Sequence, residues 1–372
     1  MELIGVDLHS DNFFVVRTRS TASGVVRTEA RYTLAEEDLD SFLRSLKKED
    51  YLLVEATTNA FWFYGRVRPF VRGCFILNVN AVKFSGNKTD RIDARRLLDI
   101  LSYYIHVRGV EQMPTVYVPR PEVAQLRSLL STYRLGKKIE NQLKNRIYSL
   151  VRQAGVAIAK RSLFTAPGWK RVTTVLPEES AIQVRLLFRQ LKESRKTTAA
   201  VRDAVVSLGA QVFPEELSLL LTIPGFGVLA AVVLLADIDT VSRFSSAKKF
   251  CAYLRTAPRI RESNNTTHLG GVSKQSRSMT CTILTQSVIH FKKAGPHFAD
   301  FYQRIRAGKS SGKARMALIR KMLVAAYFML KRRQQFSWTD PEVQLRKNSR
   351  IPREIERARR NYEAAKESSR VA

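Results

Sequence analysis

Cysteine is scarce in this sequence. The 372 residues include three cysteines, Cys74, Cys251 and Cys281. They form no Cys-x-x-Cys pair, and an odd number of cysteines spaced far apart argues against a disulfide framework. Proteins of reducing compartments have this composition, so we expect a cytoplasmic protein.

Long apolar segments are also missing. The longest uncharged apolar run, VLAAVVLLA near residue 232, is too short to span a bilayer. The first residues, MELIGVDLHS, lack the basic start and the long apolar stretch of a signal peptide. We therefore expect a soluble protein with no membrane partner.

Acidic residues are far fewer than basic ones. Lys and Arg number 63 against 33 Asp and Glu, which gives a formal net charge of +30. An excess this large indicates a polyanionic partner, and without a membrane that partner is nucleic acid. Hydrophobic residues make up 45% of the chain, enough to bury a core and to argue against global disorder. The length suits two or three domains.

Residues 1–105 show strand patterns followed by alternating helices and strands. The segments ELIGVDL, NFFVVRTRS and GVVRTEARYTL predict three strands separated by turn residues. YLLVEAT and CFILNVN predict two short buried strands, and helical patterns occur in LAEEDLDSFLRSL, NAFWFYGRVRPFVRG and DARRLLDIL. This order predicts a mixed α/β domain over residues 1–105.

Residues 106–215 have helical rather than strand patterns. One apolar stripe consists of Ile139, Leu143, Ile147, Leu150 and Ala154. A second stripe has heptad spacing, ends at Gly209 and consists of Leu187, Leu191, Ser194, Thr198, Val201, Val205 and Leu208. These stripes predict long paired helices, either as a coiled coil or as an ordinary amphipathic bundle.

Residues 216–340 begin with a Pro-Gly loop, Ile-Pro-Gly-Phe-Gly, ahead of an apolar helix. This order is typical of a helix-hairpin-helix, in which Gly225 and Gly227 would let backbone N–H groups approach a phosphate. A plain turn is the alternative. Residues 341–372 are charged and nearly free of core residues, which predicts a basic tail or an exposed helix.

The segment KTDRIDARRL contains two aspartates, Asp90 and Asp93, three residues apart among cations. One interpretation is a helix start, with Thr89 or Asp90 as the N-cap and acids in the first turn. The other is a pair of metal ligands on one helical face. In that case the cations Lys88, Arg91 and Arg95 would hold a nucleic-acid backbone.

Two further acids end predicted strands: Asp7 in GVDLHS and Glu55 in LLVEAT. Strand ends at one edge of a sheet bring together residues that are distant in sequence. Four carboxylates gathered there would repel one another unless a hard cation such as Mg²⁺ or Mn²⁺ neutralised them. Two such ions would stabilise the attacking and leaving oxygens of a phosphoryl transfer. We therefore expect Asp7, Glu55, Asp90 and Asp93 to be catalytic metal ligands.

Seven segments in this order resemble the DEDD transposases of the insertion-sequence family one-ten over nearly the whole chain. They are GVDLHS, VEAT, NKTDRIDARRLLDIL, the helical middle, IPGFG, FSSAKKFCAYLRTAPRIRESNNTTHLGGVSKQSRS and GKARMALIRKMLVAAYFML. The resemblance implies an N-terminal RNase H-like (RuvC-like) domain, a coiled-coil region and a mostly helical C-terminal transposase domain. It places the family's four acids on the residues chosen above.

The resemblance also implies a serine nucleophile. The matching residue is Ser263, five residues after Pro258, although Asn264 stands where glycine is usual and Glu262 replaces a serine. It implies that Ser263 forms a covalent phosphoserine link to DNA and that the metal site acts on the same phosphate. Four cations in or near these motifs are candidate nucleic-acid contacts: Arg259, Lys274, Lys313 and Arg320.

The function expected from these features is a DNA transposase or recombinase. The resemblance implies guidance by a structured non-coding (bridge) RNA and a homo-oligomer, either a dimer or a tetramer. A hydrolytic, metal-dependent nuclease resembling a Holliday-junction resolvase is the alternative, in which Ser263 would be structural. A non-catalytic nucleic-acid binder would keep the charge but would not need all four acids.

Overall fold

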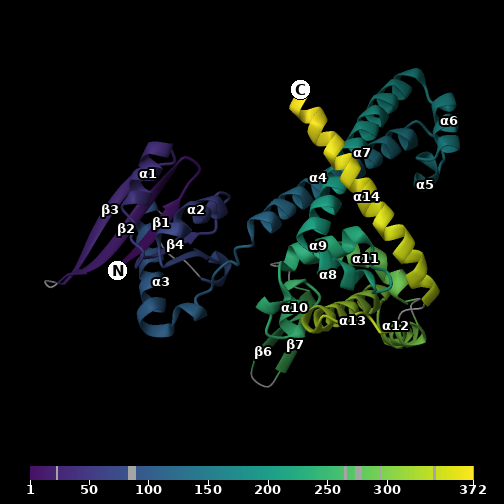
Figure 1. Ribbon diagram of the computed structural model, residues 1–372. Coiled ribbons are helices and arrows are strands. Elements are labelled where there is room, and N and C mark those ends of the chain that lie inside the picture. Colours follow the sequence, from purple (N-terminus) through teal and green to yellow (C-terminus); the bar gives the residue numbers. More distant parts are fainter. Residues whose placement is uncertain are drawn as a thin grey trace. The chain divides into compact units, whose positions relative to one another are not determined.

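The computed structural model describes residues 1–21, 24–82, 89–263, 266–272, 279–292, 295–337 and 341–371, with only the backbone described in residues 258–263 and 266–272. The chain divides into two compact units, Met1–Pro119 and Arg120–Ala372. Figure 1 shows the strands of the first unit and the mainly helical second unit.

The first unit is built on a five-stranded mixed sheet in the order β3-β2-β1-β4-β5. Strand β1 pairs antiparallel with β2 and parallel with β4, and β5 continues the parallel part. The strands are β1 (Glu2–Leu8), β2 (Asn12–Thr21), β3 (Gly24–Thr33), β4 (Tyr51–Glu55) and β5 (Gly73–Leu77). The helices are α1 (Glu36–Arg44), α2 (Ala60–Val67) and α3 (Asp90–Tyr103). The predicted order of strands and helices is confirmed.

Helices cover both faces of this sheet because its central strands have apolar residues on both sides. Ile4, Val6 and Val54 pack with α1 and α2 in one core cluster. Leu3 and Leu53 pack with α3 in another. Successive residues of β1 therefore point alternately to α2 and to α3.

Helix α3 lies unusually close to β1. A Cβ on Gly5 would be 2.6 Å from the backbone nitrogen of Leu98 and would overlap the carbonyl oxygen of Ala94. Only glycine permits this approach. The helix begins after Thr89, whose Oγ1 accepts a hydrogen bond from the backbone N–H of Ile92 at 3.3 Å. Thr89 is therefore the N-cap, and the first turn of α3 lies against the sheet.

The second unit contains long paired helices and a compact helical core. Its helices are α4 (Pro121–Gln153), α5 (Lys160–Leu163), α6 (Ala166–Val175), α7 (Glu178–Val212), α8 (Pro214–Leu221), α9 (Val228–Ile238), α10 (Ala247–Tyr253), α11 (Met279–Lys292), α12 (Pro296–Gly308), α13 (Ser311–Arg332) and α14 (Pro341–Val371). Its strands, β6 (Pro258–Ser263) and β7 (Thr266–Val272), form an antiparallel pair.

The predicted long paired helices are α4 and α7, which pack against each other. Thr198, a weak position in the heptad pattern, is buried on α7 where Gly136 of α4 leaves room for its side chain. The heptad stripe ends at Gly209, but helix α7 continues to Val212. Gly209 packs directly against Val232 of α9, so its missing side chain serves helix packing rather than helix termination.

The core of the second unit surrounds α9. Ten of the eleven residues of α9 are buried, and α8, α10, α11 and α13 contribute to the same cluster. Helix α14 packs along α7 and buries Ile351 and Ala358. The predicted basic tail is thus a long helix anchored on the core.

By length and composition, no single helix in the described part of the chain could cross a membrane. One sharply bent pair, α7 with α8, passes the same test only when the two helices are combined.

Candidate active site

The parallel pairing of β1 with β4 places two predicted acids next to each other. Val6 lies opposite Val54, so the following residues, Asp7 and Glu55, occupy adjacent positions at the ends of the two strands. Val6 and Val54 belong to the cluster on the α1 and α2 face. By strand alternation, Asp7 and Glu55 lie on the face that α3 covers.

Helix α3 brings the other two acids to this edge. Asp90 and Asp93 are in its first turn, directly after the Thr89 cap. The close contact at Gly5 holds α3 against β1, two residues before Asp7. The helix-start interpretation and the site interpretation of Asp90 and Asp93 are therefore compatible, because the same turn supplies both.

His9 lies between two of these carboxylates, although the sequence did not single it out. Its Nε2 is 3.2 Å from Asp7 Oδ2 and 3.3 Å from Asp90 Oδ1. The β1–β2 turn fixes the residue: the backbone N–H of His9 donates to Asn12 O at 2.9 Å, and Asn59 Nδ2 donates to His9 O at 2.7 Å. The available signal was Asp-x-His at a strand end, a pattern too common to assign from sequence alone.

Asp7 has an unfavourable environment for a charge. Only 7% of its surface is exposed. Burial raises the pKa of its carboxyl above the ordinary value, His9 opposes this effect, and the negative charges of Asp90 and Asp93 raise the pKa further. A carboxylate destabilised by burial and by like charges is typical of a functional site rather than of a stabilising contact.

Asp7, His9 and Asp90 each offer one ligand atom, and these atoms lie within 4.8 Å of one another. The Nε2 of His9 is buried and lies within 3.3 Å of one oxygen of each carboxylate. Two converging carboxylates and an imidazole fit a divalent cation, and the oxygens suit a hard one. In the described part of the chain, Glu55 and Asp93 are outside this close set, and Asp93 forms an ion pair with Arg96 at 3.0 Å.

The cations predicted to hold nucleic acid near this site have acidic partners on β3. Arg91 Nε is 2.6 Å from Glu29 Oε2, and Arg95 Nε is 2.7 Å from Glu29 Oε1. Burial alone would raise the pKa of Glu29, but the hydrogen bonds and charges of Arg95 and Arg91 lower it overall. Arg31 forms a similar ion pair with Asp90 at 2.6 Å. Lys88 lies outside the described residues.

Ser263 ends strand β6, where its backbone pairs with Thr266 of β7. The serine therefore stands at the end of a strand, and Asn264 lies outside the described residues. Arg259 is in the same strand, and Lys274 is also outside the described residues. Lys313 is exposed in the first turn of α13, and Arg320 lies further along that helix beside Cys251, whose pKa burial raises and Arg320 partly lowers.

The Pro-Gly loop connects α8 to α9. Gly225 has a φ of +85°, and a Cβ there would lie 2.8 Å from the carbonyl oxygen of Ser287 on α11. Both facts show that the fold requires glycine at position 225. A Cβ on Gly227 would meet no atom within 4 Å, and Gly227 lines a cavity. Of the two glycines, Gly227 is the one with room for a ligand.

Residues 217–303 match the model of the Transposase IS116/IS110/IS902 family. The chain is also similar to the pilin gene-inverting proteins of Moraxella bovis and Moraxella lacunata, at 31% identity over 147 residues in each case. The alignments include 36% of this chain and 45% of each relative, so the chain spans less than half the length of these relatives.

The predicted resemblance to the insertion-sequence family one-ten is therefore confirmed. These matches support a likeness to the transposases and recombinases of this family.

Proposed function

We propose that this protein is a DNA transposase or recombinase that cuts and rejoins strands through a metal-bound DEDD site and a serine nucleophile. In this proposal the first unit is an RNase H-like (RuvC-like) domain with Asp7, Glu55, Asp90 and Asp93 as metal ligands. Ser263 supplies the nucleophile. A structured bridge RNA selects the DNA, and the protein works as a homo-oligomer.

The observation that carries the proposal is the convergence of Asp7 and Asp90. They come from a strand end and a helix start 83 positions apart, and both approach His9 Nε2 within 3.3 Å. A folding requirement does not explain this arrangement, because it places a largely buried carboxylate beside like charges. A chain with a net charge of +30 provides the matching phosphate-binding potential.

The strand-cutting chemistry can be assigned to atoms of the chain. The Oγ of Ser263 attacks a DNA phosphorus, and a P–O bond to serine forms as the P–O bond to one deoxyribose breaks. The proton lost by the serine goes to the departing sugar oxygen, directly or through solvent. A divalent ion, when bound, supplies Lewis-acid stabilisation of charge on the phosphate oxygens. Asp7 and Asp90 would hold that ion, and His9 would contribute a nitrogen ligand or orient the two carboxylates.

Guidance by RNA and assembly into a dimer or tetramer rest on the family relationship. The name of the Moraxella relatives describes proteins that invert a pilin gene. Inversion and insertion both require cut strands to be held and rejoined. A covalent serine link serves that purpose, because it keeps the energy of the broken phosphodiester for the joining step.

The test is strand cleavage with Asp7→Asn, Glu55→Gln, Asp90→Asn and Asp93→Asn. Each variant removes one ligand charge with little change in volume, so cleavage should fall by more than about 100-fold. Asp99→Asn is the matched control, since it removes an exposed carboxylate from the same helix α3. Binding to RNA and DNA should survive in all variants. If folded variants of all four acids cut at the control rate, the metal-site proposal is wrong.

A further inference from the structure

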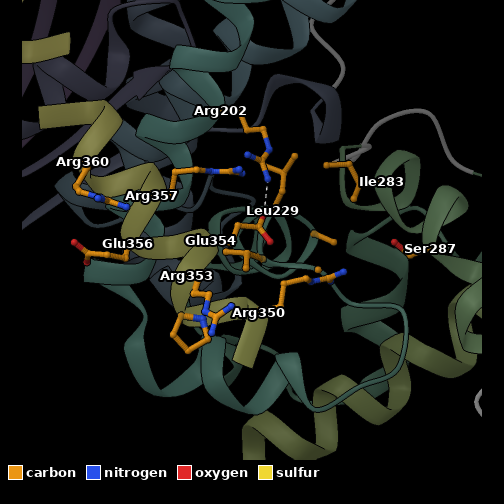
Figure 2. Close-up of a pocket in the computed structure, with 14 residues that line it drawn as sticks. Arg202, Leu229, Ile283, Ser287, Arg350, Arg353, Glu354, Glu356, Arg357 and Arg360 are labelled. Atoms are coloured by element: carbon orange, nitrogen blue, oxygen red, sulfur yellow. Dashed lines mark hydrogen bonds and ion pairs between the residues drawn. The ribbon is translucent and has the colours of Figure 1, made fainter. Parts of the chain in front are cut away.

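An arginine-rich cavity lies in the second unit between α14 and α11. Its volume is about 1030 Å³, and Gly227, Val228 and Leu229 at the start of α9 form part of its lining. Five arginines and two glutamates supply its charged groups: Arg202, Arg350, Arg353, Arg357, Arg360, Glu354 and Glu356. Figure 2 shows the charged residues of α14 on one side and Ile283 and Ser287 of α11 on the other.

Polar contacts hold helix α14 in place along this cavity. These contacts do not involve Arg350, Arg353, Arg357 or Arg360. The Nζ of Lys347 is buried and donates to the carbonyl oxygens of Leu221 and Ile223 at 2.9 and 2.7 Å. Further along α14, Glu354 forms an ion pair with Arg202 of α7. The Nδ2 of Asn361 donates to Asp203 Oδ2 at 2.7 Å. The wall that carries the arginines is therefore a preformed part of the fold.

Four arginines of α14 form one stripe along this wall. Arg350, Arg353, Arg357 and Arg360 are spaced by three, four and three residues, which places them on one helical face. At 1.5 Å per residue the stripe is about 15 Å long. All four residues are exposed, and among the described residues no ion pair joins any of them to a carboxylate. Such cations carry an unbalanced positive field into the cavity.

We propose that this cavity, the α14 arginine groove, binds the phosphodiester backbone of a nucleic-acid strand. A row of guanidinium groups fits a ligand with regularly repeated anionic charge, and guanidinium forms bidentate hydrogen bonds to phosphate oxygens. The small aliphatic floor formed by Val228, Leu229 and Ala230 can face sugar rings without offering base-specific hydrogen bonds. The groove therefore positions a strand and does not read its sequence.

This inference rests on the proposed function only for the class of ligand. The groove holds none of the four acids and not Ser263, so it contributes affinity and register rather than chemistry. Duplex DNA and structured RNA share the phosphate chemistry. The experiment below uses both, so that the probe showing the effect identifies the strand that the groove holds.

The test compares two triple variants of the full chain with equal losses of charge. Arg353→Gln/Arg357→Gln/Arg360→Gln removes three of the four stripe arginines from the groove. Arg346→Gln/Arg359→Gln/Lys366→Gln removes three cations from the same helix that do not line it. Fluorescence anisotropy with a labelled 30-base-pair duplex and a labelled RNA hairpin gives the binding constant at several salt concentrations. EDTA is present, so binding is measured while metal-dependent cleavage is off.

We expect the groove variant to lose affinity for at least one probe and its log–log salt slope to fall by about 2 to 3, because each lost phosphate contact lowers the slope by roughly 0.7 to 0.9. The slope of the control variant should change by less than about 1. Equal changes in the two variants, or no change in the groove variant with either probe, would overturn the proposal. Failure here would leave the cleavage results of the acidic variants untouched, so the two proposals are tested separately.

A substitution that is expected to raise affinity separates the effect of the groove from a loss of binding through misfolding. Glu356 lines the groove, is exposed and has no ion pair among the described residues. Glu356→Gln should therefore tighten binding to the same probe by about two- to fivefold at low salt and leave the thermal melt unchanged, as removal of one repulsive charge predicts. Unchanged or weaker binding would contradict the assignment.

Discussion

Gly5 and Leu98 are in direct backbone contact: a Cβ on Gly5 would lie 2.6 Å from the Leu98 nitrogen. This contact sets the distance between strand β1 and helix α3. Asp7 is two residues after Gly5 on the strand, and Asp90 is eight residues before Leu98 on the helix. The separation of the two carboxylates is therefore controlled by a glycine that touches neither.

The first prediction follows from this contact. Gly5→Ala should push α3 away from β1, lower stability by about 1 to 3 kcal/mol through overpacking, and reduce cleavage by separating Asp90 from Asp7. Denaturant unfolding and a cleavage assay below the melting temperature measure both effects. Gly65→Ala is the control, because a Cβ there meets no atom within 4 Å. A stable Gly5→Ala variant with normal cleavage would show that the contact does not set the site geometry.

The second prediction concerns the stability of the acidic site. The raised pKa of Asp7 means that its charged form is disfavoured in the folded protein. The native state then binds a proton more readily than the unfolded chain, so stability falls as pH rises through the interval between the ordinary pKa and the raised one. At a pH above this interval the cost is fully present. Without divalent metal, Asp7→Asn should therefore melt at a higher temperature than the wild type.

Added Mg²⁺ or Mn²⁺ should reverse this order. A ligand that binds only the folded state stabilises it, so the melting temperature of the wild type should rise with metal concentration. Asp7→Asn should respond much less, and the control Asp99→Asn should respond like the wild type. Equal responses of all three proteins would place the metal elsewhere.

The third prediction uses Lys347, which anchors α14 to the loop after α8. Burial lowers the pKa of its ammonium group to about 8, and the nearby charge of Arg350 adds to the effect. Between pH 8 and the ordinary value of 10.5 the unfolded chain binds more protons, so the native state gains stability as pH rises. The difference in unfolding free energy between wild type and Lys347→Met should increase across this window and be constant below it. Urea denaturation at several pH values checks this, and a flat difference would contradict the burial of a charged lysine.

The strands and helices of the first unit were predictable because each short apolar run has turn residues on both sides, as in YLLVEAT before the Thr58–Asn59 turn. The meeting of Asp7 with Asp90 was predictable because strand ends and helix starts converge at one edge of such a sheet. His9 was not, since its position depends on the turn between β1 and β2. The pairing of Arg91 and Arg95 with Glu29 depends on the register of β3. The local sequence of α3 does not predict that register.

The second unit was harder to predict because its helices are positioned by contacts between residues that are distant in sequence. Gly209 is an ordinary helix-stop signal, but in the structure it lies inside α7 and leaves room for Val232 of α9. The C-terminal segment has few apolar residues, and its docking depends on two of them, Ile351 and Ala358, together with the buried Lys347. Long-range packing supplied what local pattern could not.

The central claim is that Ser263 forms a covalent bond to DNA. The most direct measurement is denaturing gel electrophoresis of wild-type protein incubated with target DNA, guide RNA and Mg²⁺, followed by mass spectrometry of the adduct. We predict a protein–DNA adduct on Ser263 that is absent in Ser263→Ala and in Asp90→Asn, while both variants remain folded and still bind nucleic acid. An adduct on another residue, recombination by a folded Ser263→Ala variant, or cleavage without any adduct would contradict the claim, and the last result would favour a hydrolytic nuclease.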